Sequence, residues 1–449
     1  MEEKQQLFSN RKLIKLIIPL IIEQGLAILV GMCDGMMVSS AGEAAISGVS
    51  LVDGINAVML VLFAALATGG TVVTSQFLGA REMEKARHSA GQLVLMGGVL
   101  GVCLTVLSLA FAEPIMRLFF GSIEESVMTA GLLYFRITAL SFPFMALYNA
   151  GAAIFRSVGN SKVSMKVSVL MNFINVSGNA LCILVLKMGV AGVAVPTLIS
   201  RMVAAVVILK LASNPGQELH LQAKNIFRVH GRMMGSILRI GIPSACENSI
   251  FQLGRLVVVS MIALFGTAQT SANAVANTIQ CLGIIVGQAM GLAMVTVVGQ
   301  CVGARDLEQG VYYIKKLMKW TYVLQGSTNV LIILLLKPLI GLYSSLSPET
   351  EALAWKLVML HASVAILLWP VAFVLPNALR AANDVQFTMW VGVGSMLTFR
   401  VCTSWILCVQ LEMGAMGVWI AMMIDWVCRT TFFVWRTLSG KWKLKYKPA

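Results

Sequence analysis

Residues 18–37 read IPLIIEQGLAILVGMCDGMM, an apolar run that contains two carboxylates, Glu23 and Asp34. A run of about 20 apolar residues is long enough to cross the hydrocarbon core of a membrane as a helix. Eleven residues separate the acids, so at about 100° per residue they share one helix face, roughly 16 Å apart. An acid inside a membrane span is costly, and it indicates a functional site.

The whole chain repeats the apolar character of this run. Of its 449 residues, 58% are hydrophobic and only 12% are charged, whereas soluble domains have about 25% charged residues. No run alternates apolar and polar residues as barrel strands do. The composition therefore predicts an all-α integral membrane protein with twelve transmembrane helices. The predicted spans are roughly 13–38, 50–78, 89–111, 128–155, 165–186, 190–210, 237–264, 272–302, 318–336, 352–379, 387–410 and 415–435.

The formal net charge of +14 comes from lysines and arginines in short loops and tails. They are concentrated in the two tails and the even-numbered loops, whereas the odd-numbered loops hold only Arg117, Lys187 and Lys337. Such a bias predicts that both termini lie in the cytoplasm. We therefore expect a multi-pass protein of the cell membrane whose basic residues contact anionic lipid, with no binding of nucleic acid.

The chain contains an internal repeat. IPLIIEQG at 18 recurs as IPSACENS at 242, and SQFLGARE at 75 recurs as GQCVGARD at 299, both at an offset of 224 (242 − 18 and 299 − 75). MGVAGVAV at 188 recurs as MGAMGVWI at 413, at an offset of 225 (413 − 188). We predict two six-helix lobes, 1–211 and 236–449, joined by a cytoplasmic linker, 212–235, and related by a pseudo-twofold axis along the membrane normal. Glu23 is repeated as Glu247, whereas Asp34 corresponds to Val258.

The repeated proline-containing helix, VSLVDGINAV, SQFLGAREMEKA with its echo GQCVGARDLEQG, and FRSVGNSK resemble the multidrug and toxic compound extrusion (MATE) transporters of the MOP flippase superfamily. The resemblance implies two six-helix lobes around a cavity. It also implies secondary active antiport, in which organic, mainly cationic, drugs or toxic metabolites leave as H⁺ or Na⁺ enters by rocker-switch alternating access. We expect a monomer that binds a small-molecule substrate and needs no cofactor beyond the coupling ion.

The resemblance also implies a coupling site. One branch of the family uses an Asp on the first helix, an Asn and an Asp four residues apart on the fifth, and a Thr on the sixth. Asp34, Asn175 and Thr197 match that pattern, and Asn179 stands where the family has Asp. Asp34 is then either a proton-binding carboxyl or, with the other three residues, part of a Na⁺ site. The alternative for each is a hydrogen bond between helices.

Three further residues are candidates for the cleft or a gate: Glu23, Glu247 and His361. The two glutamates, four residues after Pro19 and Pro243, could attract a cationic substrate or bond an arginine or backbone group of the other lobe. His361 lies on the tenth helix, where another branch of the family has an acid, and it either titrates or bonds a neighbour. Five arginines also lie within or at the ends of the predicted helices, and some of them can snorkel to the membrane surface: Arg136, Arg201, Arg255, Arg400 and Arg429.

Other functions receive less support from the sequence. There is no nucleotide-binding Gly loop, nucleophile elbow or His-plus-acid metal cluster, so we do not expect an enzyme. A lipid-linked precursor flippase of the same superfamily would have extra helices and a strongly cationic cavity, whereas the face that carries Glu23 and Asp34 is acidic. A membrane receptor that transports nothing would not need so many costly polar groups in its spans.

Overall fold

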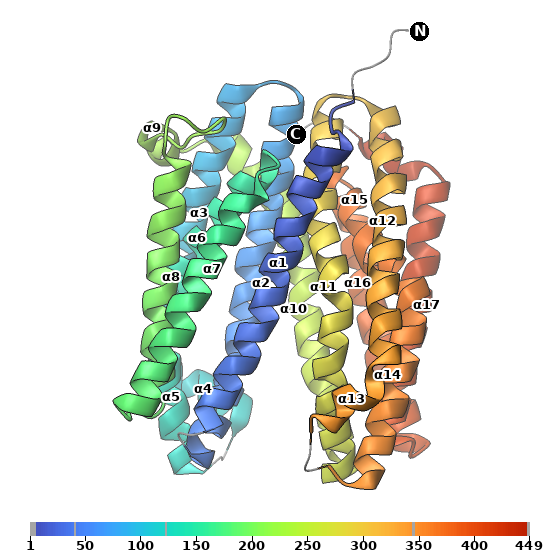
Figure 1. Ribbon diagram of the computed structural model, residues 1–449. Coiled ribbons are helices and arrows are strands. Elements are labelled where there is room, and N and C mark those ends of the chain that lie inside the picture. The colour runs from blue at the N-terminus through green and yellow to red at the C-terminus, as the bar shows by residue number, and fades with distance from the viewer. Residues whose placement is uncertain (1–5, 40–41, 122–123, 344–345, 447–449) are drawn as a thin grey trace. The chain divides into compact units, whose positions relative to one another are not determined.

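The computed structural model describes residues 6–39, 42–121, 124–343 and 346–446, without the side chains of Ser39 and Glu43, and these residues form helices and no strand (Figure 1). The helices of the first half are α1 (Asn10–Ser39), α2 (Glu43–Gly79), α3 (Met83–Ala110), α4 (Ala112–Phe120), α5 (Glu125–Ala139), α6 (Phe142–Ser157), α7 (Ser161–Ala180), the π-helical η1 (Leu181–Val185), α8 (Ala191–Ala212) and α9 (Ala223–Phe227). The second half has α10 (Gly231–Ala263), α11 (Thr267–Gly303), α12 (Leu307–Leu334), α13 (Leu336–Gly341), α14 (Pro348–Trp369), η2 (Pro370–Val374), α15 (Leu375–Ala381), α16 (Val385–Ser395), η3 (Met396–Cys402), η4 (Trp405–Gln410), α17 (Gly414–Leu438) and η5 (Lys441–Lys445).

The described helices coincide with the twelve predicted spans. Within the described residues, nine helical segments are long and apolar enough to cross a membrane, and α5 with α6, which meet at a bend of 46°, make a tenth. The other two spans are α10 and α12, which are less apolar because α10 contains Arg239, Glu247 and Arg255 and α12 contains three lysines. The all-α membrane fold is therefore confirmed. Helices suit a membrane because they satisfy their own backbone hydrogen bonds in lipid.

The chain divides into two compact units, residues 10–245 and residues 246–448 with the first nine residues. The division falls inside α10 and not in the polar linker. The first turns of α10 pack closely on α2, because a Cβ at Gly69 would lie 2.5 Å from the carbonyl oxygen of Ile237. The linker of 212–235 and the pseudo-twofold relation between the lobes stay predictions. We call the two units the N-half and the C-half.

The polar linker is held to α3 by one buried glutamine. Gln92 donates to the carbonyl oxygens of Asn225 (3.0 Å) and Arg228 (2.9 Å), and its side-chain oxygen accepts from the backbone N–H of His230 (3.0 Å). Gly91 permits this approach, since a Cβ there would lie 2.5 Å from the Asn225 oxygen. The linker is therefore an ordered part of the N-half.

The internal repeat is visible in the backbone. Left-handed residues recur at the same places in the two halves, because turns between matched helices have the same shape. The offset is 224 for Gly42 and Gly266, for Arg81 and Arg305, and for Gly159 and Asn383. It is 225 for Lys187 and Glu412 and for Gly189 and Gly414.

The change of offset from 224 to 225 therefore occurs between positions 383 and 412. The π-helical segment η3 lies there, whereas α7 of the N-half is α-helical over the matching residues. The other π-helical segment in this region, η4, has a counterpart in η1. A π turn holds one extra residue in a helix and is frequent at functional sites. We infer that η3 accommodates the inserted residue.

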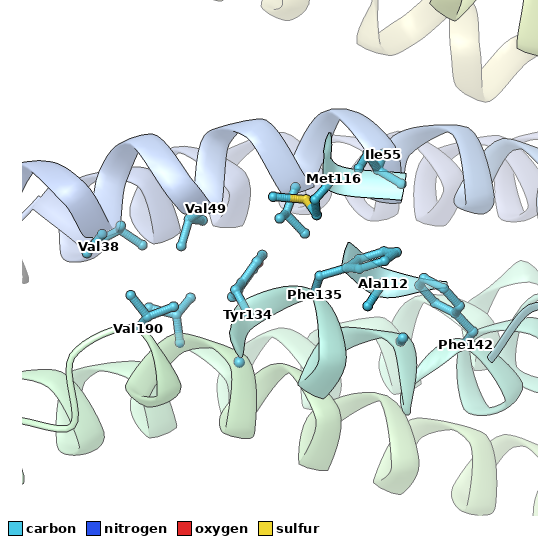
Figure 2. Packing of buried hydrophobic residues seen from close by; sticks show 14 of the residues in the cluster. Val38, Val49, Ile55, Ala112, Met116, Tyr134, Phe135, Phe142 and Val190 are labelled. Carbon is cyan, nitrogen blue, oxygen red and sulfur yellow. The ribbon is translucent and has the colours of Figure 1, made fainter. Parts of the chain in front are cut away.

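The core of the N-half packs large apolar side chains of α2 against α4, α5 and α6. Met116 and Phe135 are fully buried in this cluster, and Tyr134 lies between Val190 and Phe135 (Figure 2). Val38 of α1 extends the same cluster. The cluster thus supports α5 at the residue, Tyr134, that borders the site described below.

We predict that Gly101→Ala destabilises the protein, whereas Gly98→Ala in the same helix does not. A Cβ at Gly101 would lie 2.5 Å from the Cα of Pro143, so α3 and α6 would have to separate. Overpacking costs about 1–3 kcal/mol, more than the gain of about 1 kcal/mol from replacing a helical glycine. At Gly98 the nearest atom, in Leu147, is 3.6 Å away. Thermal unfolding of the purified protein in detergent measures both, and equal stability of the two variants would contradict the packing argument.

Candidate functional site

A cavity of about 240 Å³ lies within the N-half, between α1, α2, α5, α6, α7 and α8. Apolar side chains such as Val38 and Met145 form part of its wall. Its polar lining is unusual for a membrane span: Asp34, Ser50, Asp53, Tyr134, Asn172, Asn175, Thr197, Ser200 and Arg201. Apolar walls with a few convergent polar groups are typical of a small-molecule or ion site.

The four residues predicted as the coupling site form one chain of hydrogen bonds at this cavity. The side-chain amide of Asn179 donates to Asp34 Oδ1 (2.7 Å) and approaches Asn175 Oδ1 (3.4 Å). Asn175 in turn donates to the Thr197 hydroxyl (3.0 Å), and Thr197 donates to the carbonyl oxygen of Val193 (2.9 Å). The i, i+4 spacing on α7 places both amides on one face of the helix. The structure thus brings the four residues together.

Asp53, Tyr134 and Arg201 belong to the same site but were not among the predicted residues. Tyr134 donates to Asp53 Oδ1 (3.1 Å), and Arg201 donates to the hydroxyl of Ser141 (2.8 Å). Arg201 lies within electrostatic range of both Asp34 and Asp53. The sequence did contain a signal: Asp53 is a second acid near the start of an apolar run, which we used only as part of the motif VSLVDGINAV.

The available oxygens fit a small hard cation or a proton. Asp34 and Asp53 supply two carboxylates, and α2 thereby contributes a second acid to a site in which Asn179 replaces the family Asp. The buried Oδ1 of Asn179 has no hydrogen-bond partner in the described part of the chain. Carboxylate, amide and hydroxyl oxygens are the ligands that hard cations prefer.

Glu23 and Glu247 form repeat-related ion pairs. Glu23 lies 3.6 Å from Arg156 and Glu247 lies 2.7 Å from Arg380, and the two arginines occupy matching positions of the repeat. All four side chains are about nine-tenths buried. A bond to the other lobe was one possible role of these glutamates; in the structure each pairs with an arginine of its own half. A role of either pair as a gate stays a prediction.

His361 is buried among aromatic rings of the C-half. Its ring meets Trp426 and Trp419 edge-on, at 5.2 and 5.8 Å between centroids, and 2% of its surface is exposed. Arg400 lies within electrostatic range. The structure therefore supports packing at His361, and its function in coupling stays a prediction. Nearby on α17, Asp425 and Arg429 are four residues apart and form a buried ion pair at 3.1 Å.

Membrane-spanning helices in two repeated halves, with a polar cavity inside the first, are typical of a multi-pass transporter and not of an enzyme. The MatE family model matches the chain twice, at residues 19–181 and 243–406. The chain therefore belongs to the MatE family, as the sequence motifs indicated. The starts of the two matches differ by 224 (243 − 19) and the ends by 225 (406 − 181), which agrees with an inserted residue in the second half.

Two relatives are similar over nearly their full lengths. "Uncharacterized transporter YisQ" of Bacillus subtilis (strain 168) is 28% identical over 418 residues, which cover 91% of this chain and 90% of that protein. "Probable multidrug resistance protein NorM" of Thermotoga maritima is 26% identical over 441 residues, covering 97% and 93%.

Solved structures share the fold. A multidrug resistance MATE family transporter of the MOP superfamily in an outward-facing conformation superposes with a TM-score of 0.89 at 22% identity, covering 96% of both chains. A MOP superfamily transporter from Pyrococcus furiosus, described as having a binding pocket of reverse polarity that suggests a different function, gives 0.89 at 20% identity, covering 97% of this chain and 96% of that one.

We predict that the energetic coupling is larger for Glu247–Arg380 than for Glu23–Arg156. The former pair is hydrogen-bonded at 2.7 Å, whereas the latter is 3.6 Å apart and Glu23 also accepts from Ser164 (2.9 Å). Removing one member of a buried pair costs about 3–5 kcal/mol because it leaves an unpaired charge.

A double-mutant cycle for each pair, with Glu→Gln and Arg→Gln singly and together, measures the coupling through unfolding in detergent. The exposed pair Glu113–Arg117 (2.8 Å) is the control, for which surface pairs predict about 0–1 kcal/mol. Equal coupling in the exposed and buried pairs would show that burial does not make these contacts important.

Proposed function

We propose that this protein is a secondary antiporter that exports organic drugs or toxic metabolites in exchange for H⁺ or Na⁺. Its membership in the MatE family establishes a transporter, and the observation that supports coupling is the position of Asp34. This acid of the apolar helix α1 lines the cavity of the N-half and accepts a hydrogen bond from Asn179. The ionised form of a carboxylate in such a place is costly until a cation neutralises it.

The coupling ion would act by binding the two conformations of α1 with different affinity. A ligand shifts a conformational equilibrium only by the difference between its affinities for the two states. Gly31 and Gly35 have no neighbour that would meet an added Cβ, so α1 has free space beside Asp34. We propose that a movement of α1 exchanges the contacts of Asp34 and so links ion release to substrate binding in a rocker-switch cycle.

We further propose that the preferred substrates carry a cationic group. Within the cavity, Asp34 and Asp53 outnumber the single arginine, Arg201, so the site has an excess of negative charge. Excess negative charge raises the local concentration of cations and disfavours anions. The same charge would serve a proton or Na⁺, so substrate and coupling ion would compete for it. Both termini in the cytoplasm, a monomeric state and the cell membrane as location complete the proposal.

We predict that Asp34→Asn abolishes gradient-driven transport without unfolding the protein. The substitution removes a charge that is costly in hydrocarbon, and it also removes the group that binds the ion. In inside-out vesicles, ethidium accumulation driven by a pH gradient, and separately by a Na⁺ gradient, identifies the coupling ion. We expect at least about a tenfold loss with the gradient that drives the wild type, the loss usual for a charged contact.

Glu412→Gln is the matched control, because Glu412 is an exposed acid outside the spans. Asp53→Asn tests the second carboxylate and should reduce transport as well. Near wild-type accumulation by Asp34→Asn vesicles would remove Asp34 as the coupling residue. Ethidium movement that ignores both gradients in the wild type would contradict antiport itself.

A further inference from the structure

The C-half contains a buried arginine whose charge is not balanced. Arg400 lies in the π-helical segment η3, is 8% exposed, and has no hydrogen-bond or ion-pair partner among the described residues. Asp425 lies within its electrostatic range. That acid is already engaged, since Arg429 donates to it at 3.1 Å and the Ser395 hydroxyl donates to it as well. A buried guanidinium without a partner is expensive, which indicates a site that a ligand completes.

A second unbalanced arginine lies beside the first. Met396 at the start of η3 packs on Gly254 of α10, which has no side chain to prevent the contact. Arg255, the next residue, lies within electrostatic range of Arg400, and it has no hydrogen bond or ion pair in the described part of the chain. It precedes the end of α10 by eight residues (263 − 255), or about 12 Å of helix. An exposed arginine at that depth needs water or an anion around it.

The repeat places both arginines where the N-half has its candidate cation site. We place the inserted residue in the first turn of η3, so the offset is 224 before that turn and 225 from Arg400 onward, and the residues of that site have counterparts in the C-half. The corresponding pairs are Gly31 and Arg255, Asp34 and Val258, Asn175 and Arg400, and Asn179 and Ser404. The acid has become apolar and two neutral positions have become basic. The buried hydroxyl of Ser404, like the Asn179 oxygen, has no hydrogen-bond partner in the described residues.

We propose that Arg400 and Arg255 form a binding subsite of the C-half for an anionic group, a carboxylate or phosphate, of the transported molecule. A guanidinium presents a planar set of N–H donors that matches two oxygens of such a group. The Ser404 hydroxyl is a further donor near the same turn. This subsite specifies substrates and is separate from the coupling site around Asp34.

The inference deepens the proposed function and rests on it for transport, because it names the substrate class. The acids Asp34 and Asp53 favour a cationic group, whereas Arg400 and Arg255 favour an anionic one. Transported molecules that carry an anionic group are therefore preferred over purely cationic drugs.

A rhodamine dye with a free carboxylate, compared with the methyl ester of the same dye, tests this subsite. Both dyes carry the same cationic ring system, and only one carries an anion. Fluorescence anisotropy with the purified protein in detergent should show that the carboxylate dye binds at least about tenfold more tightly. Arg400→Met should remove this preference and leave the affinity for the ester unchanged. Arg400→Lys should retain part of it, because the charge remains.

Arg255→Gln tests the subsite independently of folding, since Arg255 is exposed, and it should also reduce the preference. Arg136→Gln is the matched control, because Arg136 is an exposed arginine in a span of the N-half. Equal affinity of the wild type for the two dyes would overturn the proposal. An equal loss of affinity for both dyes in the arginine variants would overturn it as well. Export of the ester dye under an ion gradient measures the proposed function separately.

A lipid headgroup could supply the same anionic chemistry, so the binding is repeated in vesicles. Phosphatidylcholine vesicles without and with phosphatidylglycerol distinguish the two sources. We expect the preference for the carboxylate dye to persist in pure phosphatidylcholine and to change less than twofold with phosphatidylglycerol. A preference abolished by phosphatidylglycerol in the wild type, with no such effect in Arg400→Met, would assign the arginines to a lipid and overturn the proposal.

Discussion

A charge in hydrocarbon must find its partner within the protein, and the buried glutamate–arginine pairs satisfy this condition in each half. Glu23 joins α1 to Arg156 of α6, and Glu247 joins α10 to Arg380 of α15. Each contact therefore holds the first long helix of its half against a helix whose last turn carries the arginine. That arginine is Arg156 of the FRSVGNSK motif in the N-half and its counterpart, Arg380, in the C-half. Since an unpaired member would be costly, each half could keep both members of its pair or neither. The first helices, held at the level of Glu23 and Glu247, then carry Asp34 and Arg255 farther along.

The same condition explains how much of the molecule could be predicted from the sequence. Apolar runs must form helices in lipid, so twelve spans followed directly from composition. Asp34 stood out because an acid within such a run is rare, and the family pattern added Asn175, Asn179 and Thr197, which the structure brings together. Asp53 carried the same signal as Asp34, but it was used only as a family marker.

Partners were harder to predict than individual charges. An isolated glutamate does not indicate which arginine it meets, although Glu23 and Arg156 recur together at one offset, and this shared recurrence could have predicted the pair. Gln92 could not have been predicted to hold the linker, because its bonds are to backbone groups that any sequence provides. Arg400 could not be distinguished from the other arginines of the spans, since periodicity alone does not show that a side chain is buried without a partner.

The inserted residue of the C-half links these observations. Helices α7 and α16 begin at positions that differ by 224 (385 − 161). The π turn at η3 then holds one extra residue, so the left-handed turns that follow, at Lys187 and Glu412, match at an offset of 225. The helix ends therefore stay equivalent while the middle of the span differs. A duplicated scaffold can in this way keep its ion pairs and turns and change the chemistry of a single site. The candidate site of the N-half thereby has an excess of negative charge and its counterpart in the C-half an excess of positive charge, on the same framework of helices.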